Sequence, residues 1–249
     1  MWRTYRNVLN SYPDATLSEK LLIITRFLEL PVRDIDRWIG ENDTIIELGC
    51  GRGVLANILV ALSPGRSVYG VDLRAGRIAR ALTSLKENSR IEFHVANVVD
   101  PSLYHLQQKF DIVLVSELLY LLSPGDQETV LKKASDILIP GGRLVIKDYV
   151  TRPRYKYFLF WLETNFLHYV VNWTGRIAVK LGKLGRHLQK IQTMFGVRDA
   201  VTVLSRENIS ALLIEKGWSV LSSTLPSKGF WPHCLLVCER SGADRNEEQ

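Results

Sequence analysis

A regular alternation of apolar runs and helical signals between residues 44 and 148 limits the folds open to this chain. The apolar runs are rich in Val, Ile and Leu, and they lie at 44–48, 67–72, 91–96, 111–116 and 143–148. Helical signals follow three of these runs, at about 53–62, 75–87 and 124–138. Continuous apolar strands are expected where helices cover both faces of a sheet. The alternation therefore predicts an α/β fold with a doubly wound, mostly parallel sheet.

The last part of the chain has a different pattern. A helix over 206–216 is predicted to begin after Ser205 and to stop at Gly217, and strands follow at 218–225 and 233–239. The connection between these strands is too short for a parallel crossover, so the pair should be antiparallel. The full prediction is a seven-stranded sheet with an antiparallel C-terminal hairpin. Cys234 and Cys238 should share one face of the last strand, buried and inert.

The remaining segments are predicted to be accessories of one domain. A length of 249 residues suits a single α/β domain. A helix over 16–30 and a short helix after Pro31 predict a helical cap within residues 1–40. About 50 residues separate the fifth strand from the helix at 206, which predicts a helical lid insertion at 150–200. The domain should end near residue 240, and the tail 241–249 should be disordered.

The positive charge of the chain is concentrated in that insertion. The net charge is +6, and residues 151–200 hold nine Lys/Arg against two acids, so this segment is +7 and the rest is 6 − 7 = −1. Apolar residues recur at helical spacing within 174–195, with basic residues beside them. Three interpretations stay open for this segment: an aromatic lid over an apolar substrate, a face at 155–195 that binds an anionic membrane, or a dimer interface. Nucleic acid is disfavoured because the charges alternate with bulky aliphatic residues, not stacking aromatics.

Cysteine usage and the lack of targeting signals predict a cytoplasmic protein, with the inner face of a membrane as a second location. Three cysteines without framework spacing suggest reduced thiols. The first residues contain no apolar core of signal-peptide length. The apolar stretch 157–171 is too short and too polar to span a bilayer. No metal-binding spacing of Cys or His occurs, so no metal is predicted, and no oligomeric state follows from the sequence.

The first strand leads into an unusual turn, TIIELGCGRG at 44–53. Glycine between strand and helix lets the backbone approach a ligand and points helix N–H groups at it. In a doubly wound sheet this position is the ligand crevice. Val54 breaks the dinucleotide fingerprint, and Glu47 ahead of the turn suits a positively charged ligand. Asp72, which ends the second strand, fits either a carboxylate that binds a ribose diol or a helix cap.

Five segments in order resemble the motifs of the class I S-adenosylmethionine-dependent methyltransferases, a family with a Rossmann-like fold. They are IIELGCGRG, YGVDLR, HVANVV, FDIVLVSELLYLL and IPGGRLVIKD. The resemblance implies that S-adenosylmethionine is the cofactor. It implies that the turn Gly49, Cys50, Gly51 and Gly53 holds the methionine part and that Glu47 lies near its ammonium group. It further implies that Asp72 holds the ribose. Leu73 and Val98 would cover the two faces of the adenine, and Asn97 would accept a hydrogen bond from the adenine amino group. Ser116 and Glu117 would approach the methyl group. The family often has an aspartate where this chain has Asn97.

Methyl transfer from a sulfonium needs orientation and desolvation, and at most one general base. Candidates for that base at the mouth of the pocket are Glu117, Tyr120, Asp148, Tyr149 and His168. The predicted acceptor is a hydrophobic small molecule, lipid-like or phenolic, methylated on oxygen. An RNA or protein methyltransferase and a non-catalytic cofactor-binding regulatory protein are the alternatives. The intact set of Glu47, the glycines and Asp72 argues against the last of these.

Overall fold

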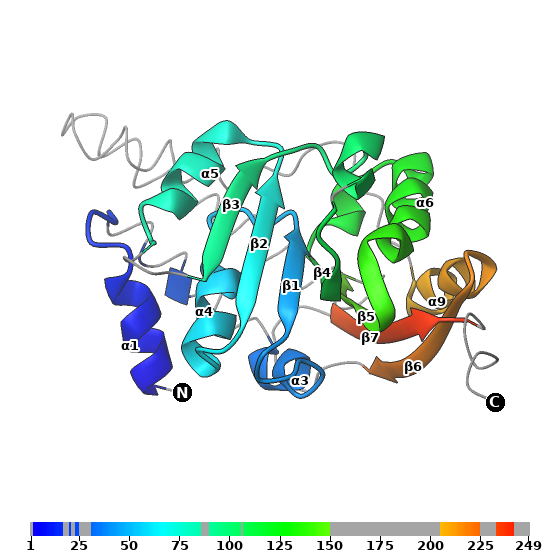
Figure 1. The fold of residues 1–249 in the computed structure, drawn as a ribbon, viewed down its shortest axis with the longest axis horizontal. Coiled ribbons are helices and arrows are strands. Elements are labelled where there is room, and N and C mark those ends of the chain that lie inside the picture. The colour runs from blue at the N-terminus through cyan, green and yellow to red at the C-terminus, as the bar shows by residue number, and fades with distance from the viewer. Residues whose placement is uncertain are drawn as a thin grey trace, which may run out of the picture. The chain divides into compact units, whose positions relative to one another are not determined.

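A seven-stranded sheet runs through the described part of the chain in the computed structural model (Figure 1). The structure describes residues 2–16, 20, 23–24, 31–85, 90–105, 107–149, 205–224 and 233–241. The strands are β1 Thr44–Leu48, β2 Ser67–Asp72, β3 Ile91–Val95, β4 Phe110–Ser116, β5 Leu138–Tyr149, β6 Trp218–Thr224 and β7 His233–Arg240. Their order across the sheet is β3-β2-β1-β4-β5-β7-β6. Strands β1 to β5 are parallel, and β7 is antiparallel to both β5 and β6, as the sequence predicts.

Helices cover both faces of this sheet. They are α1 Trp2–Asn10, α3 Val32–Asp36, α4 Val54–Leu62, α5 Ala75–Leu82, α6 Pro124–Lys133 and α9 Arg206–Glu215. One core cluster joins residues of α1, α3, α4 and α5 to one face, and a second joins residues of α6 and α9 to the other. In β1, Ile45 belongs to the first cluster, whereas Ile46 and Leu48 belong to the second. This alternation is the strand period of two, and it explains the uninterrupted apolar runs.

The predicted helix boundaries that depend on capping side chains are confirmed. Ser123 Oγ accepts a hydrogen bond of 3.2 Å from Asp126 N, and Pro124 occupies the first turn of α6. Ser205 Oγ accepts one of 3.1 Å from Asn208 N at the start of α9. Gly217 follows α9 with φ of +83°, a backbone that glycine adopts without a steric penalty. Local chemistry in the sequence is therefore enough to place these ends.

Two elements differ from the prediction. Helix α5 ends at Leu82 rather than near 87, because the hydroxyls of Thr83 and Ser84 donate to the carbonyls of Arg80 and Ala81 at 2.8 and 2.6 Å. Strand β5 begins at Leu138 rather than at 143 as predicted, so residues 140–142 lie inside it. There the register with β4 shifts, and Gly141 has φ of +75°. A glycine in this conformation allows a strand to bulge instead of ending.

Several predictions lie outside the described residues. They include most of the helix at 16–30, the insertion at 150–200, the connection at 225–232 and the tail after residue 241. Helix α1, which the sequence did not single out, packs against α4. Within the described ranges, no helix has both the length and the apolar character needed to cross a membrane.

Candidate active site

The glycine turn after β1 is tightly packed at both ends and open at its middle. Gly49, Gly51 and Gly53 have φ of +79°, +59° and +73°, a region that other residues rarely adopt. A Cβ added to Gly53 would lie 2.2 Å from Phe93 Cζ, and one added to Gly49 would lie 2.9 Å from Leu118 Cδ1. A Cβ on Gly51 would meet nothing within 4 Å. The turn thus presents open space at Gly51, at the carboxyl edge of the sheet.

The backbone N–H groups of this turn are mostly used inside the protein. Those of Gly49 and Cys50 donate to Val71 O at 2.8 and 2.9 Å, and that of Gly53 donates to Cys50 O at 3.0 Å. The N–H of Gly51 donates to Asp72 Oδ2 at 3.0 Å. The turn itself therefore offers a ligand room for close approach more than it offers hydrogen-bond donors.

Asp72 joins the glycine turn to the start of α5. Its side chain is buried, with the residue 6% exposed. Oδ1 accepts a hydrogen bond of 2.9 Å from the N–H of Arg74, the N-cap residue of α5, and Arg77 Nη1 lies 3.7 Å from Oδ2. Asp72 therefore fixes the N-cap residue of α5 through that residue's own N–H, which lies ahead of the first helical N–H groups. The bond to Gly51 also brings together the two segments that the resemblance assigns to one cofactor.

Glu47 is buried beneath the turn, only 3% exposed. Burial raises the pKa of Tyr12 to about 12, and the negative charge of Glu47 acts in the same direction. Burial, followed by the charges of Glu47 and Asp72, also raises the pKa of the Cys50 thiol. Cys50 is consequently a neutral packing residue of the turn at physiological pH and not a nucleophile.

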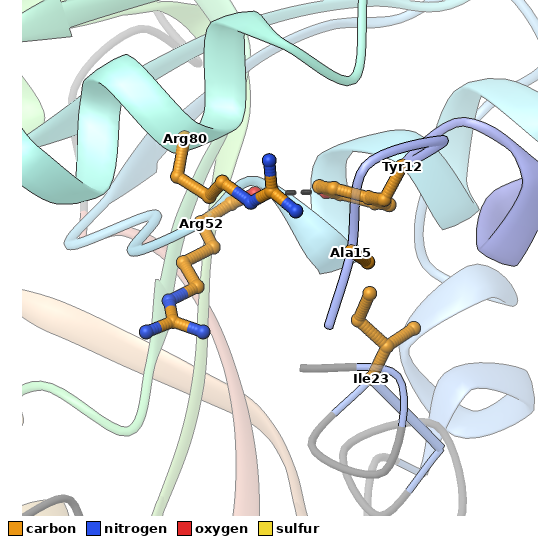
Figure 2. A pocket seen from close by; sticks show the side chains of 5 residues that line it. All are labelled: Tyr12, Ala15, Ile23, Arg52 and Arg80. Atoms are coloured by element: carbon orange, nitrogen blue, oxygen red, sulfur yellow. Dashed lines mark hydrogen bonds between the residues drawn. The ribbon is translucent and has the colours of Figure 1, made fainter. Parts of the chain in front are cut away.

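Tyr12 ties the N-terminal segment to the outside of the turn, as Figure 2 shows. Its hydroxyl donates to Arg52 O at 2.8 Å and accepts from Asn57 Nδ2 at 3.2 Å. A cavity of about 10 Å³ lies here, lined by Tyr12, Ala15, Ile23, Arg52 and Arg80. That volume holds about one water molecule. The cavity is thus too small for a cofactor, and the segment acts as a support for the turn.

The other residues that the resemblance assigns to the cofactor lie at the same edge of the sheet. Leu73 follows β2 and is 65% exposed. Asn97 is exposed, and its Oδ1 accepts a bond of 3.2 Å from Val99 N, while Val98 is buried in the second core cluster. Ser116 is half-buried at the end of β4. Their contacts with a cofactor stay predictions.

The end of β4 carries a strained residue. Glu117 has φ of +54°, the single positive value among non-glycine residues of the described ranges. Its N–H donates to Lys147 O at 2.8 Å. Such a conformation costs on the order of 1–3 kcal/mol and persists only where the surrounding structure enforces it. The strain directs the Glu117 side chain into a buried polar cluster.

This cluster joins three strands. Lys147 of β5 is 0% exposed, and its Nζ donates to Glu117 Oε1. His233, the first residue of β7, is 4% exposed, and its Nε2 lies 3.7 Å from the same oxygen. Neither residue is predicted from the sequence. Lys147 could have been found, because a lysine is unusual inside the apolar run 143–148. Nothing in the sequence near position 233 marks His233.

The other described base candidates also have structural contacts or positions. Asp148 is buried, and its Oδ2 accepts a bond of 2.6 Å from Leu119 N. It thereby holds the 3-10 turn Leu119–Leu121, which contains the half-buried Tyr120. Tyr149 ends β5 and pairs with His233 in the strand register. His168 lies outside the described residues. Among those that are described, no group of three or more His, Cys, Asp or Glu is arranged to hold a metal ion.

Comparisons with known proteins agree with this geometry. Residues 45–142 match the model of a methyltransferase domain. A ubiquinone biosynthesis O-methyltransferase of Hydrogenovibrio crunogenus is 31% identical over 103 residues, which cover 41% of each chain. A tRNA N(3)-methylcytidine methyltransferase of Drosophila melanogaster is 29% identical over 136 residues, 51% of this chain and 41% of that one. The chain thus spans about two fifths of the length of these curated relatives.

The fold extends further than the sequence similarity. The crystal structure of the Burkholderia thailandensis 1,6-didemethyltoxoflavin-N1-methyltransferase, with its substrate and S-adenosylhomocysteine bound, superimposes with a TM-score of 0.59. It is 16% identical and covers 96% of this chain and 87% of its own. At that identity the likeness concerns the fold alone. With the strand order and the glycine turn, the match over residues 45–142 makes this part of the chain similar to a methyltransferase domain.

Proposed function

We propose that the protein uses S-adenosylmethionine to methylate an oxygen atom of a hydrophobic, lipid-like or phenolic small molecule. The observation that carries the cofactor is the glycine turn, open at Gly51 and hydrogen-bonded to Asp72. These residues fit the group: three glycines leave room for close approach, and a buried carboxylate lies beside them. Glu47 adds a second negative charge below the turn, which suits a cation.

When bound, the cofactor supplies a methyl group already activated by its sulfonium. The residues of this chain then have to bind, orient and exclude water. Asp72 would hold the ribose hydroxyls, and the N–H groups of Gly51 and Arg74 fix that carboxylate in position. Leu73 offers an exposed apolar surface for the adenine. No nucleophile on the protein is needed.

Two observations support the acceptor class. One relative is named for O-methylation in ubiquinone biosynthesis, and the segment 155–195 is rich in aromatic and aliphatic residues. Another relative is named for methylation of tRNA. The alternative acceptor is therefore RNA, and a screen has to include it.

Calorimetric titration with S-adenosylmethionine tests the cofactor. We expect Asp72→Ala to weaken binding by about 1–3 kcal/mol, because charge-assisted hydrogen bonds are lost. Asp111→Ala is the matched control: Asp111 also accepts a backbone bond, from Thr44 N at 2.8 Å, but at the start of β4. It should reduce stability and leave affinity unchanged. Equal affinity of wild type and Asp72→Ala would place the ribose elsewhere.

A screen with methyl-labelled cofactor then tests the acceptor. Phenols, long-chain hydroxy compounds and total tRNA are each incubated with the full chain. Label in the organic extract is the expected result. Label in tRNA alone would replace the small-molecule proposal by the RNA alternative, and an absence of cofactor binding would remove both.

A further inference from the structure

The buried cluster of Glu117, Lys147 and His233 lies on one side of the glycine turn, and Asp72 lies on the other. The strand order places β2 next to β1 on one flank, and β4, β5 and β7 on the other flank. Leu118, which follows Glu117, is the residue that a Cβ on Gly49 would strike. The cluster is therefore at the carboxyl edge, next to the turn but away from the ribose carboxylate.

Glu117 and the buried Lys147 form an ion pair within this cluster. A lysine with no exposed surface requires a close counterion, and Glu117 Oε1 supplies it. The same oxygen lies 3.7 Å from His233 Nε2. A carboxylate beside an imidazole stabilises the imidazolium and fixes the orientation of the ring. The arrangement thus suits a histidine that gains a proton during a reaction.

We propose that His233 is the general base that accepts the proton of a phenolic hydroxyl acceptor, with Glu117 and Lys147 as positioning residues. This inference rests on the proposed function. The acceptor oxygen forms its bond to carbon as the carbon–sulfur bond breaks, and that electron pair stays on sulfur. The hydroxyl proton passes to the His233 imidazole, and the resulting imidazolium is paired with Glu117. Proton loss to water restores the base.

The strain at Glu117 supports this role over a purely structural one. A buried ion pair alone could be built from residues in ordinary backbone conformations. Here the chain keeps a non-glycine residue at φ of +54° directly after Ser116, and this conformation brings its carboxylate to both Lys147 and His233. Strain of this kind concentrates at functional sites.

Among the described residues, the His233 ring lies beside Glu117, which is paired with Lys147, and Tyr149 is opposite His233 in the strand register. Asp148 and Arg206 act on the charge of the neighbouring Cys234. Burial, and then the charge of Asp148, raises the pKa of Cys234 to about 12, so this thiol is neutral at physiological pH. Arg206 is partly exposed and pairs with Glu207. Within the described part of the chain, the charged pair beside the ring is thus Glu117 and Lys147.

A histidine NMR titration tests the cluster without any substrate. The chain has five histidines, and His233→Gln assigns the His233 resonance. Glu117→Gln should lower its protonation midpoint, and Lys147→Met should raise it, each on the order of one pH unit. The single variants could fail to fold because each leaves one charge buried alone. The double variant Glu117→Gln with Lys147→Met removes both charges, and it should show a weaker electrostatic effect on the protonation of the His233 ring.

The chain offers a matched control on its own sheet. His94 Nε2 lies 3.3 Å from Glu92 Oε2, but both side chains are exposed. Glu92→Gln should leave the His233 resonance unmoved, because solvent screens this exposed pair. An unchanged His233 midpoint in Glu117→Gln would overturn the proposal.

Kinetics with a phenol found in the screen give the second readout. His233→Gln should lower kcat by about 100-fold or more, and it should remove the acidic limb of the kcat–pH profile. Affinity for S-adenosylmethionine by calorimetry should not change. Retention of the acidic limb would overturn the role of His233 while the proposed function stands. A wild-type protein that binds the cofactor but methylates no phenol would remove the acceptor class and the base together.

Discussion

Gly51 and Gly53 share a left-handed backbone but differ in the space around them. Alanine at Gly53 combines backbone strain with a clash against the Phe93 ring, so we expect a loss of about 2–5 kcal/mol in unfolding free energy. Alanine at Gly51 meets no neighbour, so the loss should be about 1–2 kcal/mol. The Gly51 variant should still lose more than tenfold in cofactor affinity. Urea unfolding and calorimetry measure the two effects, and wild-type affinity in Gly51→Ala would exclude the turn as the cofactor site.

Tyr12 predicts a pH dependence of stability at alkaline pH. Its folded pKa is raised to about 12 from the ordinary value of 10.0, so between these values the folded state retains a proton that the unfolded state has lost. Stability from this group is complete below pH 10 and falls as the pH rises toward 12, by about 2–3 kcal/mol.

The comparison of wild type with Tyr12→Phe isolates this effect, because other alkaline groups titrate in both proteins. At pH 8 the variant should be less stable by about 1–3 kcal/mol, since Asn57 and the Arg52 carbonyl lose a partner. That difference should shrink as the pH approaches 12. A difference that stays constant across this range would show that Tyr12 is not buried as a neutral phenol.

Among the elements, the segment 155–195 is where charge and aromatic residues coincide. If it binds an anionic membrane, each lysine contributes about 1 kcal/mol, and three together change partitioning on the order of 100-fold. Flotation with phosphatidylserine vesicles should therefore fall sharply when Lys180, Lys183 and Lys190 are changed to Gln. The control replaces Lys109, Lys132 and Lys133 by Gln, with the same change in net charge. The membrane interpretation would be excluded if both variants lost flotation equally, or if the wild type bound neutral and anionic vesicles equally. The lid and dimer-interface interpretations would then be left.

For the whole molecule, the strand order predicts a gradient of hydrogen exchange. Strands β1 and β4 lie inside the sheet with nearly all of their residues buried, whereas β3 and β6 are its two edges and expose many side chains. Amides open with free energies that follow such burial. Exchange measured by mass spectrometry should be slowest in β1 and β4 and faster in β3 and β6. Equal protection of β3 and β1 would contradict the described topology.

The sequence by itself determined much of this arrangement. Apolar runs fix β1, β2 and β4 because both faces of each strand are buried. Ser123, Ser205 and Gly217 fix helix ends through contacts with residues close in the chain. The turn at 49–53 and Asp72 could be recognised because glycine and carboxylate chemistry is local to the ends of strands.

Only the tertiary structure decided which distant side chains meet. Glu117 and Lys147, 30 positions apart, pair because β4 and β5 are parallel neighbours, and His233 reaches them because β7 inserts next to β5. Tyr12 supports the turn across 40 positions through a segment without a strong sequence signal. A histidine or lysine has the same local pattern whether it faces solvent or a buried carboxylate. Its partner is set by the strand order, because packing of the whole sheet, and not the nearby residues, selects that order.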